Sequence, residues 1–192
     1  MRKVYNVLLI ILIIVAIILS AYIIINRVKS SKNQSALANK VNEIENSITQ
    51  GGSEVQSTYE GFSCLGIIEI PKIQIKYPII DATPTFENMR VSICKFWGTK
   101  LHDVGNYCIA GHHTYDGTMF GNLNKLEIND VITITDMEGV KLDYIVFDKL
   151  VIDPNDTAIV NSVDPSTREI TLITCINRNK SRLIIKARTN DK

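Results

Sequence analysis

The chain has 192 residues, enough for one domain of ordinary size with some additional sequence, and its formal net charge of +1 is unevenly distributed. Residues 1–32 contain five basic and no acidic residues, which leaves 16 basic against 20 acidic residues, a net charge of −4, for the rest. A domain with this charge offers no basic surface to a phosphate backbone, so we do not expect a nucleic-acid partner.

The first predicted element is an apolar run from Val4 to Ile25, with only Asn6 and Ser20 as clearly polar interruptions and no charge. About 20 such residues span a bilayer core, and we therefore interpret residues 1–27 as an N-terminal transmembrane anchor. A cleaved signal peptide is the alternative, but its apolar stretch is usually about 7 to 15 residues long and ends at an A-x-A-like site. Basic residues flank the run on both sides, so the positive-inside rule does not give its orientation.

Residues 28–60 are predicted to form a polar stalk rich in Ser, Asn, Gln and Lys. Within the stalk, Leu37, Val41, Ile44 and Ile48 follow one another at spacings of four, three and four residues. This spacing is typical of one face of an amphipathic helix.

Residues 61–192 are predicted to form one folded domain, and their sequence pattern is typical of β-strands. Short runs rich in Ile and Val are separated by Pro, Gly, Asn and Asp. Residues 118–129 are the only helix-sized gap, with room for a turn or two. Many short strands with one or two short helices predict an all-β fold, an eight-stranded closed or nearly closed barrel. The eight candidate strands are residues 66–70, 73–80, 91–97, 106–112, 131–135, 141–153, 169–175 and 183–187.

The four cysteines would allow two disulfides if the domain lies outside the membrane. Cys64, Cys94 and Cys108, however, lie within or beside apolar segments, where a free cysteine commonly serves as a small buried hydrophobe. Cys175 is different, because it ends the predicted strand EITLITC and is followed by the polar connection INRNKSR. We therefore expect free thiols, with Cys175 as the one at a strand end.

A cysteine at that position is a candidate nucleophile. A free thiol has a pKa of about 8.5 and is mostly protonated at neutral pH, so catalysis requires an imidazole or a cation nearby. His112 and His113 end another predicted strand, and three arginines follow Cys175. Taken singly, each of these residues fits ordinary packing or an exposed loop. Together they can converge at one rim of a barrel, because they come from the ends of three separate strands.

The combination resembles a known family. The sequence TLITC, an AGH about sixty residues earlier and an arginine directly before the last strand, LIIKA, together resemble the sortases, the cysteine transpeptidases of Gram-positive bacterial surfaces. The resemblance extends from Gly66 to Arg188. It implies a sortase-like eight-stranded β-barrel as the catalytic domain.

The resemblance also implies a role for each matching residue. Cys175 is expected to be the nucleophile, His112 the general acid and base, and Arg182 the cation that orients the substrate and stabilises an oxyanion. His112 is preferred to His113 because the family pattern places the histidine directly after a glycine, and Arg182 is preferred to the other arginines because it directly precedes LIIKA. Thr174, which matches the threonine before the cysteine, is expected to help shape the substrate pocket.

The implied function is that of a membrane-anchored transpeptidase. Such an enzyme cleaves an LPxTG-type sorting motif through a thioacyl intermediate on Cys175 and transfers the protein to a cell-wall amine. Its partners are surface proteins with a C-terminal sorting signal, and its catalytic domain is extracellular, with the N-terminus inside. We expect no cofactor, and no metal, because no acidic cluster matches a metal site and no paired CxxC or HxxxH spacing occurs.

The subclass and two other functions stay open. GHHTYDGTMFGNL, residues 111–123, resembles class B enzymes, but residues 148–168 offer little room for the helix that this class places before the nucleophile. A class A- or D-like enzyme is therefore favoured over a class B-type enzyme with a different sorting motif. A cysteine hydrolase of peptides or cell wall would use the same Cys and His, and a non-catalytic tethered barrel would bind a peptide or a metal.

Overall fold

The computed structural model describes residues 2–49, 58–98, 100–161 and 166–190. The chain divides into two compact units, Met1–Lys40 and Val41–Lys192. The boundary between them falls inside the predicted polar stalk.

Helix α1 (Arg2–Thr49) accounts for the described part of the first unit, and its residues from Val41 onward belong to the second unit. The stretch with amphipathic spacing, residues 37–48, lies in this helix, and Val41 and Ile44 are buried there. Across the part of the chain that the structure describes, no helix combines the length and the apolar character that a membrane span requires.

The second unit contains the predicted strands, so the prediction of an all-β fold for this part of the chain is confirmed. A further strand, β1 (Thr58–Tyr59), pairs with the first of them. The eight predicted strands correspond to β2 (Phe62–Ile70), β3 (Ile75–Ile80), β4 (Ile93–Trp97), β5 (Gly105–Ala110), β6 (Val131–Asp136), β7 (Lys141–Ile152), β8 (Arg168–Ile176) and β9 (Ser181–Arg188).

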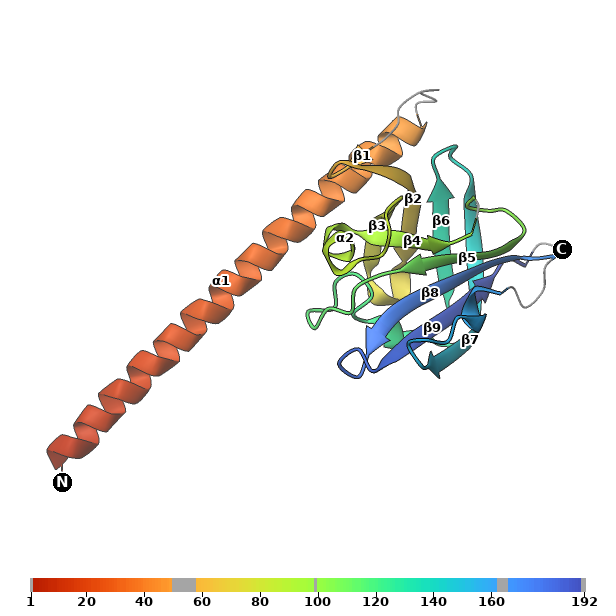
Figure 1. Ribbon diagram of the computed structural model, residues 1–192. Coiled ribbons are helices and arrows are strands. Elements are labelled where there is room, and N and C mark those ends of the chain that lie inside the picture. The colour runs from red at the N-terminus through yellow and green to blue at the C-terminus, as the bar shows by residue number, and fades with distance from the viewer. Residues whose placement is uncertain (1, 50–57, 99, 162–165, 191–192) are drawn as a thin grey trace. The chain divides into compact units, whose positions relative to one another are not determined.

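These eight strands close into a barrel. The strand order is β2-β3-β4-β5-β8-β9-β7-β6, and β6 pairs back onto β2. Two pairs are parallel, β3 with β4 and β5 with β8, and the others are antiparallel. Strands β5, β8 and β9 therefore lie side by side although some sixty residues separate the first from the second, as Figure 1 shows.

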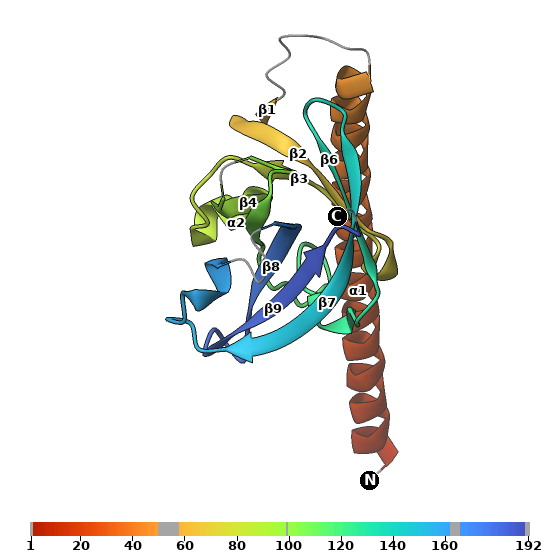
Figure 2. The same ribbon diagram turned by 90° about the vertical axis from the view of Figure 1, so that its right-hand side faces the viewer.

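Side-chain alternation along β8 separates the barrel core from the outer face of the sheet. Ile170 and Leu172 are fully buried on the inner face. Ile173 lies on the outer face, where it packs with Ile159 from the connection between β7 and β8. In Figure 2 the described part of this connection lies to the left of β8 and β9. Cys175 shares the outer face with Ile173, and the nucleophile candidate is therefore outside the barrel core.

The helices differ from those expected. Helix α2 (Phe86–Val91) lies between β3 and β4, where no helix was predicted, and the side chain of Thr85 caps it by accepting a hydrogen bond from the Asn88 amide. In residues 118–129 the structure has one short 3-10 helix, η2 (Leu123–Lys125). Two further 3-10 helices are η1 (Pro71–Ile73), which delays the start of β3, and η3 (Ala158–Val160), which precedes β8.

Candidate active site

The parallel pairing of β5 with β8 brings His112 to the end of the sheet at which Cys175 lies. Ala110 is the register partner of Ile173, and the Gly111 amide continues the pairing by donating to the Ile173 carbonyl at 3.0 Å. The Thr174 hydroxyl donates to the Gly111 carbonyl at 2.8 Å. His112 follows Gly111 just beyond the end of β5, at the end of the sheet where Cys175 follows Thr174 on β8.

The glycine before the histidine is required by close packing. The Phe120 ring is fully buried and lies directly over Gly111, so that an added Cβ would come within 2.5 Å of the ring. The Phe120 amide donates to the His112 carbonyl at 3.1 Å. Phe120 therefore fixes the backbone of both residues, and only glycine leaves room for it.

The antiparallel pairing of β8 with β9 places the arginine candidate opposite the cysteine. Cys175 and Arg182 are register partners. In an antiparallel pair, opposite residues have Cβ atoms about 4.5 to 5.5 Å apart on the same face. The short β8–β9 hairpin therefore places the Arg182 guanidinium beside the Cys175 thiol.

The turn of that hairpin holds the guanidinium. Asn177, Arg178 and Asn179 all have positive φ, between 53° and 69°, a left-handed conformation that asparagine tolerates better than most residues. This winding directs the Asn179 carbonyl at Arg182, whose Nη1 donates to it at 3.2 Å and to the Ser181 carbonyl at 3.3 Å. Part of the Arg182 donor fork is therefore oriented by its own turn.

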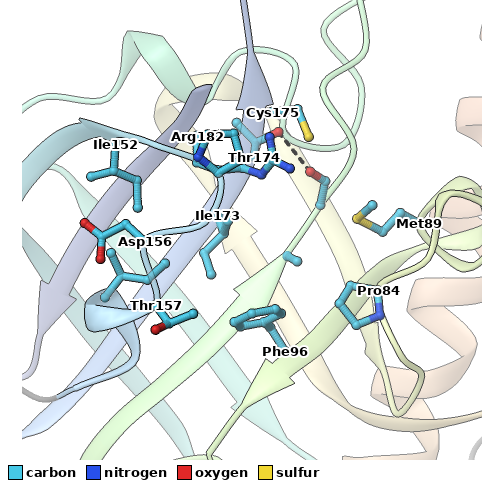
Figure 3. A pocket seen from close by; sticks show the side chains of 14 residues that line it. Pro84, Met89, Phe96, Ile152, Asp156, Thr157, Ile173, Thr174, Cys175 and Arg182 are labelled. Atoms are coloured by element: carbon cyan, nitrogen blue, oxygen red, sulfur yellow. Dashed lines mark hydrogen bonds between the residues drawn. The ribbon is translucent and has the colours of Figure 1, made fainter. Parts of the chain in front are cut away.

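A pocket of about 230 Å³ adjoins these residues. Figure 3 shows Cys175, Thr174 and Arg182 at one end of it, Ile152, Asp156 and Thr157 along one side, and Pro84 and Met89 along the other. Its lining is mainly apolar. Three of the four predicted site residues thus line one pocket, and Thr174 contributes to its shape through the bond to Gly111.

His112 is not among the pocket-lining residues, although its neighbours Ala110 and Gly111 are. Its ring meets the ring of Phe86, from the start of α2, edge to face at a centroid distance of 5.1 Å. Its Nδ1 atom is buried and has no hydrogen-bond partner among the described residues. The imidazole is therefore held by packing rather than by a carboxylate.

All four cysteines lie in the described part of the chain, and all are free. Burial raises the pKa of Cys64, raises that of Cys94 to about 11 and raises that of Cys108 to about 12. These three thiols are protonated and enclosed at neutral pH. Cys175 is only partly buried, so it is the accessible thiol.

Comparison with known proteins agrees with this geometry. A family model described as "Sortase domain" matches residues 68–190, which is more than half of the chain. The chain belongs to the sortase family.

Individual sortases are identical to this chain at about a quarter of the aligned positions. Sortase A of Listeria monocytogenes serovar 1/2a (strain ATCC BAA-679 / EGD-e) is 28% identical over 120 residues, which cover 62% of this chain and 52% of that protein. The match thus spans about half the length of this curated relative. The Clostridium perfringens Sortase D5 transpeptidase superposes with a TM-score of 0.67 at 26% identity, covering 82% of this chain and 99% of that one.

A third similar structure is Clostridium perfringens sortase C with the C-terminal cell wall sorting motif. It superposes with a TM-score of 0.60 at 24% identity and covers 84% of this chain and 91% of that one. At this identity the likeness concerns the fold alone.

The walls of the pocket are what sequence reasoning missed in this sortase. Pro84 and Met89 come from the segment around α2, and Phe96 comes from β4. Asp156 and Thr157 come from the connection after β7. Pro84 and Thr85 before a short helical stretch were a usable signal for α2, but no pattern in a single sequence indicates which loop side chains face the cysteine. Among the described residues, no group of three or more His, Cys, Asp or Glu is placed to hold a metal.

Proposed function

We propose that this chain is a class A- or D-like cysteine transpeptidase that cleaves an LPxTG-type sorting motif and transfers the acyl part to a cell-wall amine. The observation that carries the proposal is the pairing of Cys175 with Arg182 at the end of a mainly apolar pocket. A non-catalytic barrel would have no need for a cation fixed opposite an accessible thiol.

The first half of the reaction forms a thioacyl enzyme. The Cys175 thiolate attacks the carbonyl carbon of the Thr-Gly peptide bond, a C–S bond forms, and the carbonyl oxygen takes up the electron pair. Arg182 donates hydrogen bonds to this oxyanion with the part of its fork that the turn carbonyls leave available. When the tetrahedral species collapses, the C–N bond breaks and protonated His112 gives its proton to the leaving amine.

The second half of the reaction regenerates the enzyme. An amine acceptor attacks the thioacyl carbonyl, and His112, now neutral, takes the proton from the attacking nitrogen. The C–S bond then breaks, with the electron pair returning to sulfur. The acyl group ends in a new amide, and Cys175 returns to the thiolate.

The lining of the pocket suits the apolar part of a sorting motif. Ile152, Ile159, Met89 and Phe96 offer apolar surface to leucine and proline side chains. Asp156 is the one carboxylate among the described lining residues, and its Oδ1 accepts from the Ala158 amide at 2.9 Å, which fixes its orientation. The fold-related C. perfringens sortase C was solved with a C-terminal cell wall sorting motif, which supports a substrate of this class.

We further propose that α1 anchors the enzyme in the membrane, with the N-terminus inside and the barrel outside. The support is the uncharged run from Val4 to Ile25, whose described apolar side chains from Ile10 onward are exposed. An extracellular barrel would meet surface proteins that carry a sorting signal, and the cell-wall precursor amine, at the wall face of the membrane.

Product analysis tests the function. The full-length protein is incubated with an LPxTG-type peptide, with and without a series of amine acceptors, and the products are identified by mass spectrometry. We expect an amine-linked product that is lost in Cys175→Ala, His112→Ala and Arg182→Ala. Release of free acid at the same rate with and without acceptor would instead assign a hydrolase. Absence of turnover across a library of sorting peptides would contradict the enzyme assignment.

A further inference from the structure

The first part of the connection between β7 and β8, residues 153–161, crosses the outer face of the sheet and forms one wall of the pocket. Ile159 packs there onto Cys108, Ala110, Ile173 and Ile184. Pro154, Asp156 and Thr157 from the same connection line the pocket, as does Ile159. The position of this connection therefore sets the width of the space in front of Cys175.

Polar side chains of the sheet hold this connection by its backbone. The Asn106 side-chain amide donates to the Ile159 carbonyl at 3.0 Å and to the Val160 carbonyl at 3.1 Å. The Lys186 ammonium donates to the Asn161 carbonyl at 3.2 Å. Three consecutive carbonyls of the connection are thus bound by two side chains from two different strands, β5 and β9.

Thr171 on β8 connects the two donor residues, Asn106 and Lys186. Thr171, which is fully buried, donates to the Asn106 carbonyl oxygen at 2.8 Å and so orients the amide with its NH₂ toward the connection. Thr171 is also the register partner of Lys186 on β9 and of Cys108 on β5. Alternation therefore places Thr171, Lys186 and Cys108 on the same outer face as Cys175, which lies four residues further along β8.

A lysine at this position requires an explanation, because only 6% of Lys186 is exposed. Burying an ammonium group costs several kcal/mol unless hydrogen bonds and opposite charges compensate for it. Packing alone would be satisfied by an apolar residue, as it is two residues earlier on β9 by the fully buried Ile184. The Lys186 ammonium donates a hydrogen bond to the Asn161 carbonyl, and this contact gives the lysine a role in holding the connection.

We propose that Asn106 and Lys186 are positioning residues. They hold residues 153–161 in the position in which this segment forms the pocket wall that contacts the substrate peptide. They act on substrate binding and not on the chemistry at Cys175. This inference rests on the proposed function for its kinetic part, whereas the holding of the connection is measurable without any substrate.

The test uses the full-length protein and three variants. Asn106→Asp keeps an acceptor for Thr171 but removes the donor, Lys186→Met removes the ammonium and retains the apolar stem, and Lys186→Arg keeps a donor. The matched control is Lys141→Met, an exposed lysine at the start of β7. Each protein is examined by hydrogen–deuterium exchange of residues 153–161, by steady-state kinetics with the sorting peptide, and by the rate of Cys175 alkylation.

Loss of one or two hydrogen bonds should raise the exchange rate in residues 153–161 about three- to tenfold in Asn106→Asp and Lys186→Met. The KM should rise by a similar factor while kcat changes less than about twofold, since the interaction is made equally in the ground state and the transition state. Cys175 alkylation should be unchanged. In Lys186→Arg the exchange rate and the KM should both stay close to their wild-type values, because a donor is retained. Lys141→Met should match the wild type.

Unchanged exchange in both variants would show that Asn106 and Lys186 do not hold the connection. Faster exchange with an unchanged KM would show that the connection does not form the substrate wall. A fall in kcat with slower alkylation would assign the two residues to the catalytic centre, and would also overturn the proposal. If the wild type turned over no peptide, the proposed function would fail, while the exchange data would still decide whether the two side chains hold the connection.

Discussion

Cys175 on β8 and Arg182 on β9 face each other directly as cross-strand partners, and the hairpin that joins them leaves only a four-residue turn. The Arg182 Nη1 atom is bound by the carbonyls of Asn179 and Ser181. The planar fork of a guanidinium suits this arrangement, because one edge contacts the turn while, in the proposed reaction, the rest binds the oxyanion.

The first prediction concerns this fork. Arg182→Lys keeps the charge but replaces the fork by a single ammonium group, which cannot contact both the turn and the oxyanion. We expect kcat/KM for the sorting peptide to fall by about 10² or more, close to the loss in Arg182→Ala, as when an oxyanion donor is removed. Arg178→Lys, at an exposed turn position, is the control and should stay within about twofold. Activity near the wild-type level in Arg182→Lys would show that charge alone suffices.

The second prediction concerns the thiols. Burial raises the pKa of Cys94 to about 11 and that of Cys108 to about 12, so both thiols remain protonated at pH 7.5 and are enclosed as well. Iodoacetamide should therefore add one group per folded chain, at Cys175, and none to Cys175→Ala. Peptide mapping by mass spectrometry checks the site. Equal labelling of Cys108 in the folded protein would contradict the burial of that thiol.

The third prediction concerns Gly111, over which the Phe120 ring lies. Gly111→Ala forces its Cβ against this ring, and we expect a loss of about 1 to 3 kcal/mol in the free energy of unfolding together with a reduced kcat, because His112 is displaced. Phe120→Leu in the same chain should relieve the contact and recover part of both. The comparison is a double-mutant cycle read by denaturant unfolding and by turnover. Strict additivity of the two substitutions would exclude the steric explanation.

The fourth prediction is a dependence of stability on pH that originates at His102, which is not one of the candidate site residues. Burial lowers the pKa of His102 below its usual value of 6.5, and Asp136, Arg168 and Lys100 are the charged groups that act on it. Its Nδ1 is bonded to the Tyr144 hydroxyl at 2.9 Å and its Nε2 to the Val140 carbonyl at 3.1 Å. The neutral ring, donating from Nε2 and accepting at Nδ1, satisfies both contacts.

Because the unfolded chain binds the proton more tightly than the folded one, this stabilisation is fully present above about pH 6.5 and is lost as the pH falls from there toward the folded pKa. The melting temperature of the wild type should decrease between pH 7.5 and 5.5 more steeply than that of His102→Asn, a residue that tolerates the φ of 67° at this position. His113→Asn is the control and should keep the wild-type slope. Parallel pH profiles for all three proteins would remove His102 as the origin.

Local patterns predicted the strands but not all of their limits. The runs of Ile and Leu in β8 and β9 place apolar residues on both faces of the sheet, which is typical of a buried strand. The expected strand at 73–80 begins later, because Pro71 starts a 3-10 turn that ends with Gln74 in a left-handed conformation. Helix α2 escaped prediction since six residues, FENMRV, are too few to establish a helical period.

The candidate site could be predicted as a set of residues but not as an arrangement. The motifs around His112, Cys175 and Arg182 point to them individually. The placement of His112 at the same end of the sheet as Cys175 depends on the parallel pairing of β5 with β8, a contact between residues some sixty positions apart whose register no local pattern specifies. The pocket wall carrying Asp156, and the Asn106 and Lys186 contacts behind it, depend on the path of a loop and were therefore missed.

Intact-mass analysis of the enzyme after brief incubation with an LPxTG-type peptide, in the absence of any amine acceptor, tests the central claim most directly. The account predicts a covalent adduct with the mass of the peptide segment up to its threonine, located by proteolysis on the peptide that contains Cys175, and discharged on addition of an acceptor amine. It also predicts no adduct in Cys175→Ala. Peptide cleavage that persists in Cys175→Ala, or an adduct on any other residue, would contradict the assignment of Cys175 as the nucleophile.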